Sequence, residues 1–221
     1  MNQIRSYLVL AALCLLLIGA TFNAYGAVAA KKTPEAAAYE KDVDKLTDLI
    51  VTLMPLGKVF ESIAAENPAW PVQDQPDRVT KLQLHCLRSE LSTEGYRKLK
   101  RKDVEAYAAA HRETLKSDIQ ALESGAAELF GKLVMAGADA ERTGVEVKAE
   151  DVLKSASAAQ IESFSFFFGE PKLLDLRKVG GIGNALSTDK SKEENKSAGE
   201  ALGEDMASKF MATAMKTCEV N

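Results

Sequence analysis

Residue types that catalytic and metal sites commonly use are scarce in this chain of 221 residues. It contains 2 histidines, 3 cysteines and 1 tryptophan, and aromatic residues make up 6% of it. A zinc site needs several His, Cys or carboxylate ligands at suitable spacing, and neither H-E-x-x-H nor C-x-x-C occurs in the sequence. The G-x-S-x-G elbow of serine hydrolases is absent as well. We therefore expect no catalytic site, no metal and no cofactor.

Excess positive charge and strand-like alternation are also missing. The chain carries 28 Lys and Arg against 32 Asp and Glu, which gives a net charge of −4. Nucleic-acid binding requires a strongly basic face, and attraction to an anionic membrane requires clustered cations. Only residues 143–148 alternate between apolar and polar, over too short a stretch to predict a sheet. We expect a protein partner and no nucleic acid.

A long unbroken apolar run occurs at the N-terminus, over residues 8–20. Arg5 precedes this run, and Ala27-Val28-Ala29 fits the A-x-A pattern that signal peptidase recognises. The run is shorter than the about 20 apolar residues that a membrane-spanning helix needs. The sequence thus predicts a cleaved signal peptide over residues 1–29, a periplasmic domain over residues 30–221, and no stable membrane span after cleavage.

Two cysteines, Cys86 and Cys218, remain after such cleavage. Because free thiols are uncommon in oxidising compartments, we expect these two residues to form a disulfide. The alternative is that each cysteine is unpaired and packs as a small hydrophobic residue.

Apolar residues recur every three or four positions through most of the chain, which indicates amphipathic helices. The predicted helices cover residues 33–66 with a break at Pro55, then 75–91, 104–133, 149–156, 157–169 and 202–218, with a further turn or two after Pro171. Residues 184–199 are polar and lack this periodicity, so they predict a mobile loop. We expect an all-α, single-domain antiparallel bundle with one long central helix and a C-terminal helix behind a flexible loop.

The densest cluster of positive charge predicts a candidate interaction surface. It comprises Arg97, Lys98, Lys100, Arg101 and Lys102. One interpretation is a docking patch for an acidic partner or for lipid head groups. The other is a solvated turn between two helices.

The helix predicted to begin at Ser157 carries a second candidate surface. At 100° per residue, Ile161, Phe164, Phe167 and Phe168 share one side, while Phe166 points nearly opposite. Either this helix is buried on two sides, or Phe166 is exposed and marks a binding surface.

Two further motifs have both a functional and a structural interpretation. The sequence Gly180-Gly181-Ile182-Gly183 superficially suggests a phosphate loop, but it follows a predicted helix rather than a strand, which favours a C-cap and turn. His111 lies near Glu94, Glu105, Glu113 and Asp118, and this arrangement leaves open either a hydrolase or a hydrogen-bonded core histidine beside solvated charges.

Residues 167–174 read F-F-G-E-P-K-L-L and resemble the tail motif F-Y-x-S-x-x-G-x-K of an uncharacterised family of exported, all-helical bacterial proteins. The second aromatic residue is Phe168, Gly169 or Glu170 stands where the family has serine, and the spacing before Lys172 is shorter. The resemblance implies a location in the bacterial envelope and a helical fold, and it implies no activity.

The combined features favour a non-enzymatic protein–protein interaction module of the bacterial envelope, such as an adaptor, an inhibitor or an immunity-type protein. An alternative is a helical carrier that holds a lipid or another small apolar ligand. A third hypothesis is a hydrolase that uses His111.

Overall fold

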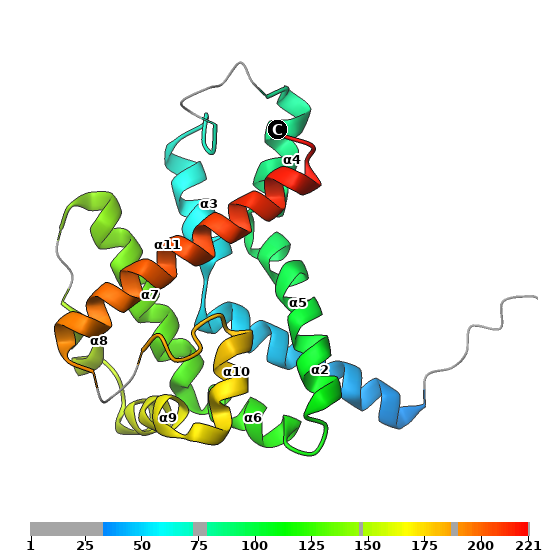
Figure 1. Cartoon of the computed structure of the whole chain (residues 1–221), viewed down its shortest axis with the longest axis vertical. Coiled ribbons are helices and arrows are strands. Elements are labelled where there is room, and N and C mark those ends of the chain that lie inside the picture. Colours follow the sequence, from blue (N-terminus) through cyan, green and yellow to red (C-terminus); the bar gives the residue numbers. More distant parts are fainter. Residues whose placement is uncertain (1–32, 73–78, 146–147, 187–189, 221) are drawn as a thin grey trace, which may run out of the picture. The chain divides into compact units, whose positions relative to one another are not determined.

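The computed structural model describes residues 33–72, 79–145, 148–186 and 190–220. Every regular element in these ranges is helical and none is a strand, which confirms the predicted all-α class (Figure 1). The chain divides into two units, with the boundary between Ala37 and Ala38. The interactions described below belong to the second unit, apart from the first turn of helix α2. The predicted signal peptide lies outside the described residues.

The elements follow one another along the chain as helices of 6 to 26 residues, with one π-helical turn (η2) and one 3₁₀ turn (η3) among them. They are α2 (Pro34–Leu53), α3 (Leu56–Glu66), α4 (Lys81–Glu90), α5 (Thr93–Ala110), α6 (Leu115–Ala121), η2 (Leu122–Ala126), α7 (Ala127–Thr143), α8 (Ala149–Lys154), α9 (Ala158–Gly169), η3 (Pro171–Leu173), α10 (Leu174–Val179) and α11 (Lys192–Thr217).

Two predicted helix starts are confirmed by their capping bonds. The hydroxyl of Thr33 accepts the N–H of Ala36 at 3.2 Å, and Ser157 and Gln160 form a reciprocal capping box at the start of α9. The break at Pro55 is confirmed too, because this residue separates α2 from α3. Side chains that accept the first free N–H groups of a helix favour initiation at that residue.

Helix α4 begins later than predicted. Thr80 forms a capping box with Gln83, so the helix starts at Lys81, and residues 75–78 of the predicted helix lie outside the described residues. The side chain of Leu82 near its start is 78% exposed, whereas Leu87 is fully buried. This helix therefore contacts the core through its C-terminal turns.

The prediction of a single long helix over residues 104–133 is wrong. Helix α5 ends at Ala110, and the chain turns at residues 111–114 before α6 begins. The hydroxyls of Tyr107 and Thr114 both donate to the buried carboxylate of Asp118, at 2.9 and 2.8 Å. These bonds hold α6 against the end of α5. The apolar periodicity continues across the turn because both helices bury residues in the same core.

A second interruption of that predicted helix occurs at η2, where Gly125 has a φ of 127°. This conformation is open to glycine and strained for other residues. Ser163 on α9 binds backbone groups on both sides of this interruption. Its hydroxyl accepts a hydrogen bond from the N–H of Ala126 at 3.1 Å and donates one to the carbonyl of Ala121 at 3.0 Å. Helix α9 is thereby positioned against η2.

Replacing Ser163 with alanine should lower the free energy of unfolding by about 1–3 kcal/mol, since it leaves two buried backbone groups without partners. Urea denaturation followed by circular dichroism measures this loss. Ser165→Ala is the matched control, because Ser165 is exposed on the same helix. Its expected effect is within about 0.5 kcal/mol. Equal stability of the two variants would contradict the bridging role of Ser163.

The prediction of a mobile loop over residues 184–199 is wrong for the second half of this range. Helix α11 begins at Lys192, so residues 192–199 are helical. Ser191 and Glu194 form a capping box that initiates the helix before its apolar face begins. Residues 187–189 of the predicted loop lie outside the described residues.

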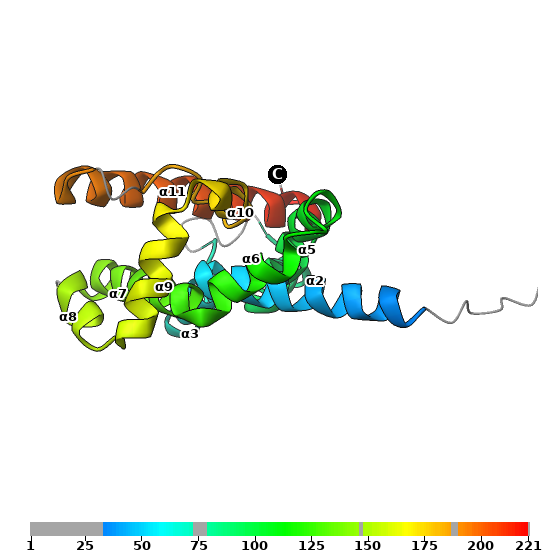
Figure 2. The ribbon, with the colours of Figure 1, turned by 90° about the horizontal axis from the view of Figure 1, so that it is seen from below.

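Helix α11 crosses one side of the 38–221 unit, as Figure 2 shows, while α3 and α7 lie on the other side and α9 runs between them. Its predicted apolar face is confirmed: Met206, Phe210, Ala214 and Cys218 are buried. The Phe210 ring is stacked on Phe60 with centroids 5.6 Å apart. The sulfur atoms of Cys86 and Cys218 are bonded, which confirms the predicted disulfide between α4 and the C-terminal end of α11.

Candidate partner-binding groove

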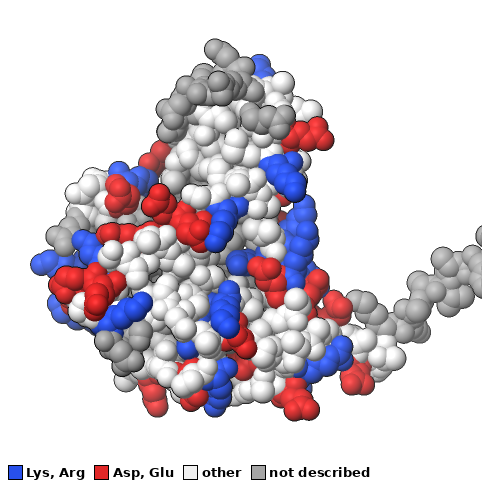
Figure 3. Space-filling model, viewed as in Figure 1, with Lys and Arg blue, Asp and Glu red and all other residues white. Residues whose placement is uncertain are grey.

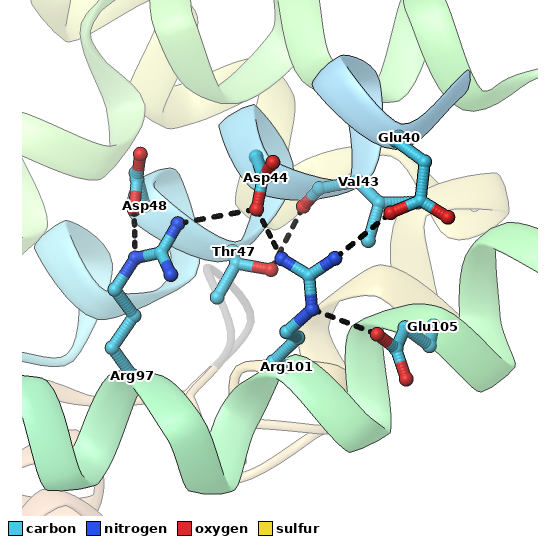
Figure 4. A network of polar contacts seen from close by, with 8 residues as sticks. All are labelled: Glu40, Val43, Asp44, Thr47, Asp48, Arg97, Arg101 and Glu105. Atoms are coloured by element: carbon cyan, nitrogen blue, oxygen red, sulfur yellow. Dashed lines mark hydrogen bonds and ion pairs between the residues drawn. The ribbon is translucent and has the colours of Figure 1, made fainter. Parts of the chain in front are cut away.

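The two arginines of the predicted basic surface point toward α2 and bind its acidic side chains (Figure 4). Nε of Arg97 lies 2.6 Å from Oδ1 of Asp48. The guanidinium of Arg101 contacts the carboxylate of Asp44, and its Nη2 lies 3.1 Å from Oε2 of Glu40. The hydrogen bond from Arg101 lowers the pKa of Asp44 below its usual value. These two cations therefore join α5 to α2.

Two of the three lysines in this cluster also have partners. Nζ of Lys98 lies 3.2 Å from Oε1 of Glu90. Nζ of Lys100 donates to the carbonyl of Val179 at 2.9 Å, and its side chain is only 11% exposed. Lys102 is exposed and has no carboxylate partner in the described part of the chain. On the face that Figure 3 shows, charges of both signs are interspersed.

Four of the five basic residues thus have partners within the chain, and all five lie inside helix α5 rather than in a turn. The sequence could not reveal this pairing. Asp44 and Asp48 precede Arg97 and Arg101 by 49 to 57 residues, and only the packing of α5 on α2 brings them together.

The aromatic cluster of α9 is buried on one side and exposed on the other. Phe167 and Phe168 are buried, while the Phe166 side chain is 45% exposed, with Nζ of Lys172 lying 5.5 Å from its ring centroid. Ile161 was expected on the buried side, but it is 42% exposed. Phe166 belongs to α9 and the predicted basic residues to α5, so the two candidate surfaces lie on separate helices.

His111 forms the C-cap of α5, and its ring stacks on Tyr107 with centroids 4.2 Å apart. Within the described residues, no hydrogen bond or ion pair joins its imidazole to a carboxylate. Asp118, one of the acids near His111 in sequence, accepts bonds from two other side chains instead. The described residues also contain no group of three or more His, Cys, Asp and Glu that could hold a metal ion.

The glycine turn after α10 is a helix C-terminus, as the favoured interpretation predicted. Gly181 and Gly183 have φ values of 85° and 53°. The N–H groups of Ile182 and Gly183 both donate to the carbonyl of Arg177, at 2.9 and 3.1 Å. Because these N–H groups are already bonded within the chain, they cannot also cradle a phosphate.

An open groove of about 750 Å³ lies between α3 and α7. This volume falls in the range of protein binding sites. Its apolar lining consists of Val51, Pro55, Met135 and Ala136, and Gly131 lies among them. Its polar lining consists of Thr52, Lys58, Ser62, Thr93, Glu128, Lys132 and Asp139. We call this feature the α3–α7 groove.

Two glycines allow the close helix contacts at one end of the α3–α7 groove. A Cβ atom on Gly131 would lie 2.2 Å from the carbonyl oxygen of Thr52, so α7 packs directly on the end of α2. A Cβ atom on Gly57 would lie 2.5 Å from the Cα of Thr93, so α3 packs directly on the start of α5. The absence of side chains at these two positions fixes where the groove begins.

An ion pair between Glu66 and Arg142 joins the C-terminal ends of α3 and α7. The two helices therefore run in the same direction between two fixed points, and Figure 1 shows them side by side. This pair is parallel, unlike the antiparallel neighbours expected from the sequence. The 11 residues of α3 span about 16 Å at 1.5 Å per residue.

In the described part of the chain, every charged residue that lines the α3–α7 groove has an ion-pair partner, with one exception. Nζ of Lys132 lies 2.7 Å from Oε1 of Glu128, and this contact lowers the pKa of the glutamate. Oδ1 of Asp139 lies 3.1 Å from Nη2 of Arg142. Lys58 is exposed and has no carboxylate partner among the residues that the structure describes. In that part of the chain, the groove thus combines apolar side chains with one uncompensated positive charge.

Comparison with known proteins gives this chain no relative. No protein-family model matches it, and neither a curated protein nor a solved structure is similar to it. The resemblance of residues 167–174 to a family of exported helical proteins therefore stays a prediction.

Proposed function

We propose that this protein is a non-enzymatic binding protein of the bacterial envelope, and that a segment of a partner protein occupies the α3–α7 groove. The observation that carries the proposal is the groove itself. Met135 and Ala136 line it from α7, Val51 and Pro55 line it from the α2–α3 junction, and most of the other lining residues are polar or charged. Protein interfaces likewise combine apolar and polar residues.

The covalent bond between Cys86 and Cys218 supports a location outside the cytoplasm. Disulfides persist in oxidising compartments and are rare in reducing ones. The predicted signal peptide over residues 1–29 also supports a location outside the cytoplasm. Within the described residues, none of the helices is sufficiently long and apolar to span a bilayer.

The carrier hypothesis remains the second candidate because the volume of about 750 Å³ would also hold a small apolar molecule. Sites for small molecules usually bury 70–90% or more of their ligand. The α3–α7 groove is open to solvent, which suits a segment of a larger partner better than a ligand that must be mostly buried.

A photoreactive benzoylphenylalanine placed at Met135 tests the proposal in cells of the native organism. Met135 lines the groove and is half-buried, so the probe contacts whatever occupies it. The same probe at Ala212, an exposed position on α11, is the matched control. After irradiation, we expect a discrete protein adduct from Met135 and little from Ala212.

Mass spectrometry of the adduct separates the candidate functions. A protein adduct specific to Met135 supports the binding module, and an added mass of lipid size supports the carrier instead. The same adduct pattern from both positions, or none from either, would overturn the proposed use of the groove. Circular dichroism confirms that each labelled variant is folded.

A further inference from the structure

One face of helix α7 lines the α3–α7 groove. The residues that line it are Glu128, Gly131, Lys132, Met135, Ala136 and Asp139. Their spacing of i, i+3, i+4, i+7, i+8 and i+11 is that of a single helix face, which here carries both small or apolar residues and charged ones. On the opposite wall, Pro55, Lys58 and Ser62 repeat at three and four residues.

The residue types on these walls also suit a helix as the occupant. The short side chain of Ala136 leaves room for a close backbone approach. Met135 beside it has a flexible, polarizable side chain. The α7 residues that line the groove run from Glu128 to Asp139, over about 16 Å, which is the length of about three helical turns. An extended peptide would cover this distance in about five residues and would not match the spacing of the α7 face.

We infer that the occupant of the α3–α7 groove is an amphipathic helix of a partner protein, about three turns long, with an acidic side chain opposite Lys58. This inference rests on the proposed function and names the chemistry of its partner. Amphipathic helices bind such grooves through anchors at i, i+3, i+4 and i+7.

Charge complementarity identifies where the acidic side chain lies. Glu128 and Lys132 compensate each other, and Asp139 is held by Arg142. The ammonium group of Lys58 has no such partner in the described residues, and it lies on the α3 wall beside the apolar lining. A carboxylate supplied there by the partner would complete the pairing and fix the orientation of the bound helix.

Charge reversal at Lys58 tests the inference in the cross-linking experiment with the probe at Met135. We expect Lys58→Glu to lower the yield of the protein adduct at least about fivefold, since attraction is replaced by repulsion. Lys58→Arg should keep most of the yield. Lys102→Glu is the matched control, because Lys102 is exposed and also has no carboxylate partner in the described residues, but lies on α5.

The possible outcomes separate this inference from the proposed function. An adduct whose yield is unchanged by Lys58→Glu would overturn the acidic contact and leave the proposed function standing. Loss of the adduct only in Lys102→Glu would overturn the inference in favour of a basic docking surface on α5. The absence of any adduct from Met135 would overturn the proposed function itself.

A second measurement tests the helical character of the occupant. The cross-linked partner segment, identified by mass spectrometry, is synthesised as a peptide and mixed with the purified full chain. We expect helical circular dichroism to exceed the sum of the two separate spectra, and Lys58→Glu to weaken binding of this peptide at least about fivefold. Binding without a gain in helix would overturn the inferred conformation.

Discussion

Replacing Phe210 with alanine should lower the free energy of unfolding by about 3–5 kcal/mol, the usual cost of removing a buried phenylalanine. The Phe210 side chain is 3% exposed. Its ring centroid lies 5.6 Å from that of Phe60 on α3 and 5.0 Å from that of Tyr96 on α5. The substitution therefore leaves a cavity where α3, α5 and α11 meet.

Urea denaturation measures this loss, and Lys209→Ala on the neighbouring position is the control. Lys209 is exposed and forms an i,i+4 ion pair with Asp205, so its expected cost is within about 0.5 kcal/mol. A loss below about 1 kcal/mol for Phe210→Ala would mean that α11 contributes little to the core. Hydrogen exchange would then show which part of α11 opens independently.

Replacing both Cys86 and Cys218 with serine should lower the free energy of unfolding by about 2–5 kcal/mol under oxidising conditions. The two residues are separated by 132 positions, so their bond constrains the unfolded chain over a long loop. For loops longer than 100 residues, the chain-entropy model gives about 4–5 kcal/mol. Thermal and urea unfolding of the oxidised protein and the double variant measure the difference.

Excess dithiothreitol provides the control for the disulfide. It should destabilise the native sequence to nearly the level of the double variant and leave the double variant unchanged. If the native sequence were equally stable in both conditions, the bond would not contribute to stability. The double variant could also be less stable than the native sequence by the same amount in oxidising and in reducing conditions. In that case the sulfur atoms would contribute to stability through packing alone.

Local sequence signals predicted those parts of the fold that depend on neighbouring residues. The capping box at Ser157, the break at Pro55 and the buried face around Phe210 are each determined within one or two helical turns. The capping box at Ser191 was an equally local signal, and it was missed because the polar composition of residues 192–199 masked it.

Contacts between distant segments explain what the sequence did not predict. The long predicted helix is interrupted at Gly125, whose conformation depends on a bond network supplied by Ser163 of another helix. The α3–α7 groove depends on the close approach of Gly131 to Thr52, which lies 79 positions earlier. Nothing in the residues around Gly131 indicates that Thr52 is its neighbour.

The bond between α4 and the end of α11 has a consequence for fragmentation of this protein. Its sulfur atoms belong to Cys86 and Cys218, which lie 132 positions apart, and the bond closes the chain between them into a ring. A protease that cuts the backbone once anywhere inside that ring severs the polypeptide without releasing a piece. On a non-reducing gel the cleaved molecule has the mass of the intact chain plus one water. A reducing agent then separates the two fragments.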